Sequence, residues 1–319
     1  MPVEAKRDHA VLRAIQERIR AGSTPTARTD GMRVVLSIEG GGNRGVIAGG
    51  MAAVLDEAGL LPAFDAVYGS SAGTLTAAWL LSGHIDAGLE AWTDPPSYAR
   101  ATRRTNVLHG RPPYDVEWLI ETYYDQTLGL DADAILANPI SLHPLATDAA
   151  TGASCDLGPL VHDKASLHLA MRASSGLPIL AGRPLAFGGR RFLDAGLSES
   201  IPLDTPIAAG ATHVLALATR PRGSLSNDSR AVQWITDRWM RRHAPGAREA
   251  FLQRNSRAGE VAARLEQYAV DASTDPAVLT VRPGEQSPHV GRGETDPAAM
   301  RGGADAGVDA MRRVIAHLG

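Results

Sequence analysis

The stretch RVVLSIEGGGNRG, residues 33–45, decides the fold, because an apolar run opens directly into a glycine-rich turn. We expect a buried strand at 33–38 and a helix near 44–58, where the turn ends. Three consecutive glycines leave backbone N–H groups uncovered, and such a turn after a strand usually holds an anion. The stretch therefore predicts a strand, an anion-binding turn and a helix, and leaves the identity of the anion open.

A second strand, turn and helix follow at once. The strand is expected at 64–68 (FDAVY), the turn is GSSAG at 69–73, and an Ala/Leu-rich helix continues to about residue 82. Alternation of strands and helices at these lengths indicates parallel βαβ units. Successive turns of such units open at the same carboxyl edge of the sheet. The Gly40–Gly45 loop and Ser71 are therefore expected to face one crevice.

Later segments extend this α/β pattern. Residues 1–30 are interpreted as an N-terminal helical appendage with an amphipathic helix at 4–20, and residues 31–319 as one α/β domain with a helical insertion at about 93–135. The expected elements are strands at 140–146, 191–193, 213–219 and 278–282 and helices near 161–174, 230–268 and 304–318.

Composition narrows the function classes. The 319 residues are 44% apolar and 21% charged, which is typical of a globular enzyme, and a net charge of −3 argues against a nucleic-acid partner. The single cysteine, Cys155, excludes an intramolecular disulfide, and no Cys/His spacing suggests a metal site, so we expect neither metal nor cofactor. The N-terminus lacks the apolar core of a signal peptide, and no apolar run reaches a membrane span, so a cytoplasmic location is expected.

The glycine loop fits two nucleotide motifs poorly. Gly40, Gly42 and Gly45 match GxGxxG, but a dinucleotide site also wants an acidic residue ending the second strand, where this chain has Tyr68 and Gly69. Asp65 lies at the start of that strand instead. A phosphate-binding P-loop requires a lysine after the glycines, and none follows.

The GSSAG turn fits GxSxG with Ser71 at its centre. In such an elbow the serine stands on a sharp strand-to-helix turn, where the helix N-terminus favours negative charge on its oxygen. The same residues also fit an ordinary turn with a serine helix cap. If the elbow is real, amides of the glycine loop would hold the oxyanion of a tetrahedral intermediate, and the anion is transient. Arg44 either steadies that loop or faces solvent.

The serine requires a base. His289, in QSPHVGRG, comes last in chain order, as the histidine of a hydrolase triad would. Asp194, in RRFLDAGLSESIP, follows a short strand and precedes a small-residue turn, although Asp-Ala-Gly is also a common turn sequence.

Taken together, these motifs resemble the patatin-like phospholipases over about residues 33–220. GGGNRG is similar to their oxyanion loop, GSSAG to their serine elbow, DAG to their catalytic Asp-Gly-Gly or Asp-Gly-Ala, and ASSGLP at 173–178 to their helix-end motif. The resemblance implies a three-layer α/β sandwich with a mostly parallel sheet. It also implies a Ser–Asp dyad in a serine hydrolase of lipid esters (phospholipid or lysophospholipid), with neither metal nor cofactor. The implied site comprises Ser71 as nucleophile, Asp194 as general base and acid, Gly40, Gly41, Gly42, Asn43, Arg44 and Gly45 as oxyanion hole, and Gly69 and Gly73 at the elbow.

Two alternatives and one departure stand beside this interpretation. An α/β-hydrolase esterase would use Ser71, Asp194 or Asp204, and His289, and a non-catalytic lipid-binding protein would have the same fold. Ala195 occupies a place usually held by glycine, and a positive φ there would displace Asp194.

Substrate contacts are less defined. An acyl chain needs an apolar trough, which we expect between the elbow helix (Leu75, Trp79 and Leu80) and the insertion. Such residues more often belong to a core, so none of the three is assigned to the substrate. The region 230–257 carries Trp234, Trp239 and Met240 among seven arginines, opposed only by Asp237 and Glu249. Such a helix suits peripheral contact with anionic lipid, or packs its tryptophans inward. The basic run RATRR at 100–104 suits the same face or a solvated loop.

Overall fold

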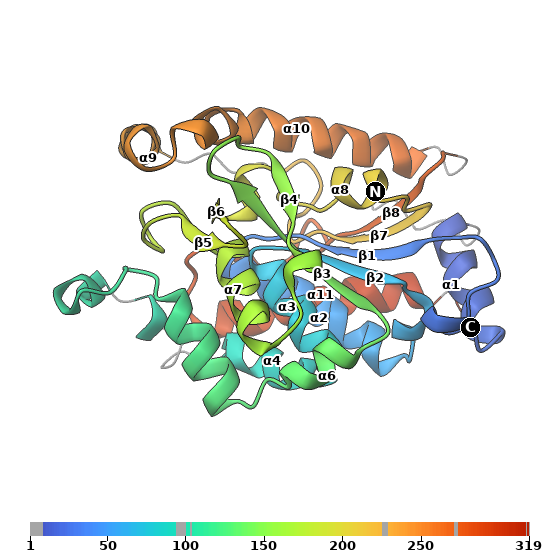
Figure 1. Cartoon of the computed structure of the whole chain (residues 1–319). Coiled ribbons are helices and arrows are strands. Elements are labelled where there is room, and N and C mark those ends of the chain that lie inside the picture. The colour runs from blue at the N-terminus through green and yellow to red at the C-terminus, as the bar shows by residue number, and fades with distance from the viewer. Residues whose placement is uncertain are drawn as a thin grey trace.

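A β-sheet of eight strands runs through the middle of the molecule (Figure 1). This computed structural model describes residues 9–93, 100–102, 104–224, 229–270, 274–316 and 318. The strands are β1 Val34–Ile38, β2 Ala66–Ser70, β3 Ser141–Asp148, β4 Ser154–Asp156, β5 Leu185–Phe187, β6 Arg190–Leu193, β7 His213–Leu217 and β8 Ala277–Val281. The helices are α1 Ala10–Arg20, α2 Gly45–Glu57, α3 Ala72–Leu81, α4 Ile85–Thr93, α6 Ala132–Ala137, α7 Lys164–Ser174, α8 Asp204–Ala208, α9 Arg230–His243, α10 Arg248–Val270 and α11 Pro297–Ile315.

The strand order is β5-β6-β3-β2-β1-β7-β8, with β4 paired to β3. The central strands β3, β2, β1, β7 and β8 pair in parallel, whereas β4, β5 and β6 add antiparallel pairs at one side. Every residue of β1 and β2 is buried, as expected for parallel strands covered on both faces. The two glycine-rich turns therefore leave neighbouring strands at the same carboxyl edge.

Helices cover both faces of the sheet (Figure 1). Helices α2, α3, α4 and α11 build the main core with apolar residues of β1, β2, β7 and β8. On the opposite face, Leu265 of α10 packs against Val35, Val214 and Val278. The prediction of a three-layer α/β fold with a mostly parallel sheet is confirmed.

Some boundaries differ from the sequence predictions. One helix was expected over 230–268, but α9 and α10 are separated at 244–247, where Pro245 lacks an N–H and a Cβ on Gly246 would lie 1.8 Å from the carbonyl of Ala150. Helix α11 begins at Pro297 rather than 304, because Asp296 caps it and proline suits the first helical position. The short strands β4 and β5 were not predicted.

The insertion expected at 93–135 is described in part, because 94–99 and Arg103 lie outside the described residues, as do residues 4–8 of the predicted first helix. Its described elements are the 3-10 turns at Arg104–His109, a π-helix at Trp118–Thr127 and α6.

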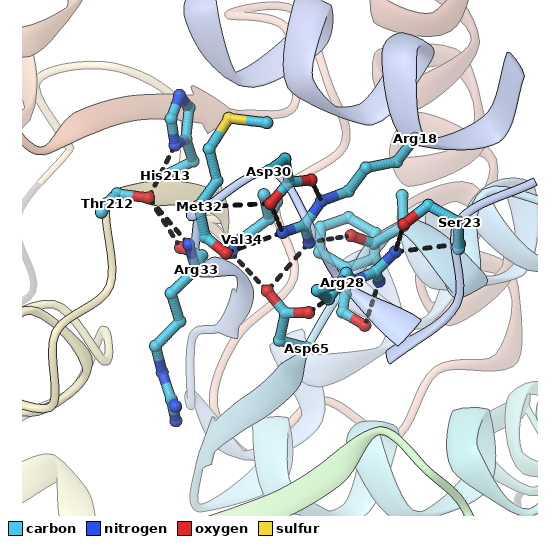
Figure 2. A network of polar contacts seen from close by, with 12 residues as sticks. Arg18, Ser23, Arg28, Asp30, Met32, Arg33, Val34, Asp65, Thr212 and His213 are labelled. Carbon is cyan, nitrogen blue, oxygen red and sulfur yellow. Dashed lines mark hydrogen bonds and ion pairs between the residues drawn. The ribbon is translucent and has the colours of Figure 1, made fainter. Parts of the chain in front are cut away.

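A polar network ties α1 to the amino edge of the sheet, opposite the glycine-rich turns (Figure 2). Arg18, only 2% exposed, donates to both carboxylate oxygens of Asp30 at 2.7 and 3.0 Å and to Asp65 at 2.8 Å. Asp65 also accepts the N–H of Val34 and the guanidinium of Arg28. Asp65 therefore has a structural role where the second strand begins.

Candidate active site

Ser71 forms a strained elbow between β2 and α3. Its φ of 54° and ψ of −122° are rare for a residue with a side chain. The turn is tight on both sides, because a Cβ on Gly69 would lie 2.5 Å from Cα of Thr74 and one on Gly73 would lie 2.2 Å from the carbonyl of Ile38. Small flanking residues are thus required for the backbone to turn here.

The hydroxyl of Ser71 donates to Oδ2 of Asp194 at 2.7 Å, although 123 positions separate the two residues. Asp194 follows β6, and its backbone is held by the carbonyl of Gly176 at 2.9 Å and by the Thr147 hydroxyl at 2.8 Å. Its second oxygen, Oδ1, accepts the N–H of Gly196 at 2.8 Å. The carboxylate is therefore fixed at one oxygen and presents the other to the serine.

Burial changes the proton affinity of this pair. Asp194 is 4% exposed and Ser71 8%. Burial raises the pKa of the Asp194 carboxyl, while the bonds from Ser71 and Gly196 and the charge of Arg292 lower it in part. A carboxylate with a raised pKa beside a hydroxyl is a better base than an exposed one.

The Asp-Ala-Gly turn accepts alanine without strain. Among the described residues, only Ser71 and Ile179 are non-glycine residues with positive φ, so Ala195 is not one of them. Ala195 is fully buried and opens a 3-10 turn. The residue that requires glycine is Gly196, where a Cβ would lie 2.9 Å from Oδ1 of Asp194.

The glycine loop lies against the elbow, since a Cβ on Gly40 would be 3.0 Å from Cβ of Ser71. Several of its amides are already committed. Gly40 donates to the carbonyl of Ser200, Asn43 to that of Arg292, and Gly45 within its own turn. Within the described part of the chain, the N–H groups of Gly41 and Gly42 have no hydrogen-bond partner.

A C-terminal segment covers this loop. Asn43 binds it twice, through its N–H to the carbonyl of Arg292 at 2.9 Å and through its side-chain amide to the carbonyl of Glu294. Gly42 has a φ of 60°, and a Cβ there would lie 2.5 Å from the Arg292 carbonyl. Arg44 is buried beside the loop, only 8% exposed, rather than facing solvent.

The two side chains of the alternative triad lie elsewhere. His289 belongs to the covering segment but is exposed, and Asp204 is paired with Arg264 at 2.7 Å on the surface of α8. Both oxygens of Asp194 bond to other groups, Ser71 and Gly196.

Ser174 holds the elbow in place. Its hydroxyl accepts the N–H of Ser71 at 2.9 Å and bonds to the hydroxyl of Thr74 at 2.7 Å. Ser174 belongs to the ASSGLP motif, as does Gly176, whose carbonyl binds Asp194. The motif was visible in the sequence, but its contacts to both Ser71 and Asp194 were not.

A groove of about 770 Å³ has Gly176 and Arg172 in its lining, together with apolar and charged residues of the segments 107–117 and 179–186. Val116, Ile179 and Leu185 contribute apolar surface to it. The expected trough wall differs, because Leu75, Trp79 and Leu80 of α3 are at most 1% exposed and belong to the core.

The described residues contain no group of three or more His, Cys, Asp or Glu side chains arranged to hold a metal ion. None of their helices combines the length and hydropathy needed to cross a membrane.

Comparisons with known proteins identify the family of the chain. The family model for patatin-like phospholipase matches residues 36–207, more than half of the chain. A crystal structure of VipD from Legionella pneumophila is similar with a TM-score of 0.44 and 14% identity, over 90% of this chain and 67% of that one. No curated protein matches the sequence.

Proposed function

The chain belongs to the patatin-like phospholipase family and is a lipid acyl hydrolase acting on ester bonds, and from this premise we propose that Ser71 and Asp194 form its catalytic dyad. The observation that carries the proposal is the 2.7 Å hydrogen bond from the Ser71 hydroxyl to the buried Asp194 carboxylate. The proposed substrate is a phospholipid or lysophospholipid.

In the first half-reaction, Asp194 takes the proton of Ser71 as Oγ attacks the ester carbonyl. The carbonyl oxygen becomes an oxyanion, and the uncommitted N–H groups of Gly41 and Gly42 are the proposed donors to it. Removal of one such donor typically costs about 2.7–4 kcal/mol of transition-state stabilisation. The intermediate collapses when the alkoxide leaves and takes the proton from Asp194, and the acyl group remains on Ser71.

In the second half-reaction, water attacks the acyl-enzyme while Asp194 accepts its proton. Collapse of the second tetrahedral intermediate breaks the bond to Oγ, returns the proton to Ser71 and releases the fatty acid. The groove that Gly176 lines is the proposed acyl-chain site, because Gly176 also binds the backbone of Asp194 and part of the groove wall is apolar.

Peripheral membrane contact through α9 is the second part of the proposal. Trp234 and Ile235 are 66% and 51% exposed, and Arg238 and Arg242 lie exposed on the same face of the helix. Met240, by contrast, is fully buried. An exposed apolar stripe among arginines is typical of a helix that lies on anionic lipid.

The test is hydrolysis of a lipid panel by the wild type beside Ser71→Ala and Asp194→Asn. Each variant should lose roughly 10³-fold or more in kcat, because both residues act in the same step. A fluorophosphonate probe should label the wild type at Ser71.

Two controls make this test specific. Ser70→Ala removes the neighbouring hydroxyl, which donates to the carbonyl of Glu199, and should keep both hydrolysis and labelling. His289→Ala should also stay active. Activity that survives in Ser71→Ala, or collapses in His289→Ala, would rule out the dyad.

A further inference from the structure

The buried guanidinium of Arg44 has no ion pair within 4 Å among the described residues, and the charge of nearby Glu39 raises its pKa only in part. The residue is 8% exposed, its Nε has no hydrogen-bond partner, and none of the described carboxylates lies within ion-pair distance of it. The adjacent acid, Glu39, is engaged elsewhere, because its Oε2 accepts the N–H and the hydroxyl of Thr219 at 2.5 and 3.0 Å. A buried unpaired guanidinium is costly, so a ligand anion is the natural partner.

Two further arginines flank the same loop. The carbonyl of Arg292 accepts the N–H of Asn43 at 2.9 Å, which places this residue directly over the glycine turn. Arg220 follows Thr219 at the carboxyl end of β7, the strand that pairs with β1. Burial lowers the pKa of Arg44 to about 10, the charges of Arg220 and Arg292 lower it further, and the charge of Glu39 raises it in part. Like charges are therefore gathered at this point of the sheet edge.

The three arginines and the Ser71–Asp194 dyad lie at the same edge of the sheet. The glycine loop separates Ser71, on the β2 side, from Thr219 and Arg220, on the β7 side. The charge of Arg292 influences the pKa values of both Arg44 and Asp194, so this arginine lies within electrostatic range of the loop and the dyad. An anionic group near an ester bound at Ser71 would meet these guanidinium groups.

We propose that Arg44, Arg220 and Arg292 form a phosphate-binding site across the glycine loop from Ser71. This inference rests on the proposed function, since it identifies the bound group as the phosphate of the lipid substrate. Guanidinium groups match the tetrahedral oxygens of phosphate and bind them through charge-assisted hydrogen bonds. Inorganic phosphate shares this chemistry and is the other source that the experiment must distinguish.

The first arm compares two soluble esters with the same acyl chains, dihexanoylphosphatidylglycerol and dihexanoylglycerol. The wild type should prefer the phosphate-bearing ester in kcat/KM. Arg220→Gln and Arg292→Gln should each reduce this preference about tenfold, because each removes one charge-assisted contact. Arg312→Gln is the matched control: this exposed arginine of α11 pairs with Glu57 at 3.4 Å and should not change the ratio.

The second arm measures binding of inorganic phosphate to Ser71→Ala protein by isothermal titration calorimetry, which requires no turnover. Added Arg220→Gln or Arg292→Gln should weaken binding at least about tenfold, and added Arg312→Gln should not.

The two arms distinguish a lipid head group from free phosphate, and they test the phosphate site separately from the dyad. Loss of both preference and phosphate binding in the arginine variants supports a head-group site. Loss of phosphate binding alone, with the ester ratio unchanged, supports a site for free phosphate. Esters that are hydrolysed with no dependence on these arginines, together with no phosphate binding, would overturn the site and leave the dyad standing. Phosphate binding that depends on the arginines, in a protein that hydrolyses neither ester, would support the site and overturn the proposed function.

Discussion

The hydroxyl of Ser174 accepts the backbone N–H of Ser71 at 2.9 Å, so a residue 103 positions away fixes the orientation of the elbow. Removal of the Ser174 hydroxyl would leave the buried N–H of Ser71 without an acceptor, which costs about 1–3 kcal/mol. If the strained elbow then relaxes, the Ser71 hydroxyl moves away from Asp194.

We therefore expect Ser174→Ala to lower kcat about 5–100-fold with little change in KM, and to slow fluorophosphonate labelling in parallel. Ser175→Ala is the matched control, because the Ser175 hydroxyl is buried without a hydrogen-bond partner in the described structure. A Ser174→Ala enzyme that is less stable but labels at the wild-type rate would show that Ser174 only supports the fold.

The strain at Ser71 can be measured as stability. A φ of 54° with ψ of −122° costs a residue with a Cβ about 1–3 kcal/mol, whereas glycine adopts it readily. The free energy of unfolding of Ser71→Gly, measured in urea titrations, should therefore exceed that of Ser71→Ala by about 1 kcal/mol. Both variants lack the hydroxyl, so the difference reports the backbone. Equal stabilities would mean that the elbow is not strained.

The pH dependence of hydrolysis should report Asp194. The base must be ionised, and burial raises its pKa above the ordinary value of 3.8. Activity should therefore be present at high pH and fall as pH drops through this raised pKa. Because the charge of Arg292 lowers the pKa of Asp194, Arg292→Gln should move the acid limb of kcat/KM to still higher pH, measured with the uncharged dihexanoylglycerol. A limb that moves to lower pH would contradict this electrostatic relationship.

Sequence patterns predicted the two βα turns and the residues of the proposed site because short motifs carry those signals locally. The GSSAG turn, the glycine loop and the Asp-Ala-Gly turn each need small residues for steric reasons that hold in any context. The role of Ser174 was not predictable, because a serine in a helix end shows nothing of the N–H that it will meet. The segment around QSPHVGRG was singled out for His289, yet it contacts the glycine loop through Arg292 and Glu294.

The buried state of Arg44 depends on tertiary packing in the same way. Its position in GGGNRG was equally compatible with a solvated side chain. The loop that carries it follows β1, which pairs with β7, and is contacted by the C-terminal segment through Arg292, so its surroundings come from residues far apart in the chain. Propensity and spacing do not encode such long-range contacts.

The network at the amino edge should make stability sensitive to acid. The hydrogen bonds from Arg18 hold the pKa of Asp30 down at about 2, below its ordinary 3.8. The ionised Asp30 carboxylate therefore stabilises the folded state above about pH 4, and this stabilisation is lost as the pH falls from about 4 to 2. The stability gap between wild type and Asp30→Asn should therefore narrow over this range in urea titrations. Asp133→Asn, at an exposed position of α6, should show no such gap, and a constant gap for Asp30→Asn would refute the linkage.

We expect membrane contact at the side of the molecule where the carboxyl ends of the parallel strands lie. Figure 1 shows α9 and the 104–109 turns extending from that side, on the left of the view, and α1 at the opposite end. The 104–109 turns expose Leu108 by 82% and Val107 by 58%, beside the groove that Gly176 lines. Exposed apolar residues of α9 and of the 104–109 turns thus lie on the same side of the molecule as the proposed site.

Trp234→Ala and Leu108→Ala should each weaken binding to phosphatidylglycerol vesicles about tenfold in sedimentation assays, since burying such a side chain is worth roughly 1.5–3 kcal/mol. Arg242→Gln should weaken binding further at low salt, because each arginine near an anionic surface contributes about 1 kcal/mol. Val270→Ala provides the matched control: Val270 is 77% exposed and is the last residue of α10, the helix that runs away from α9 toward the right of Figure 1. Equal effects of all three apolar substitutions would indicate nonspecific adsorption, and would remove the reason for assigning α9 to the lipid surface.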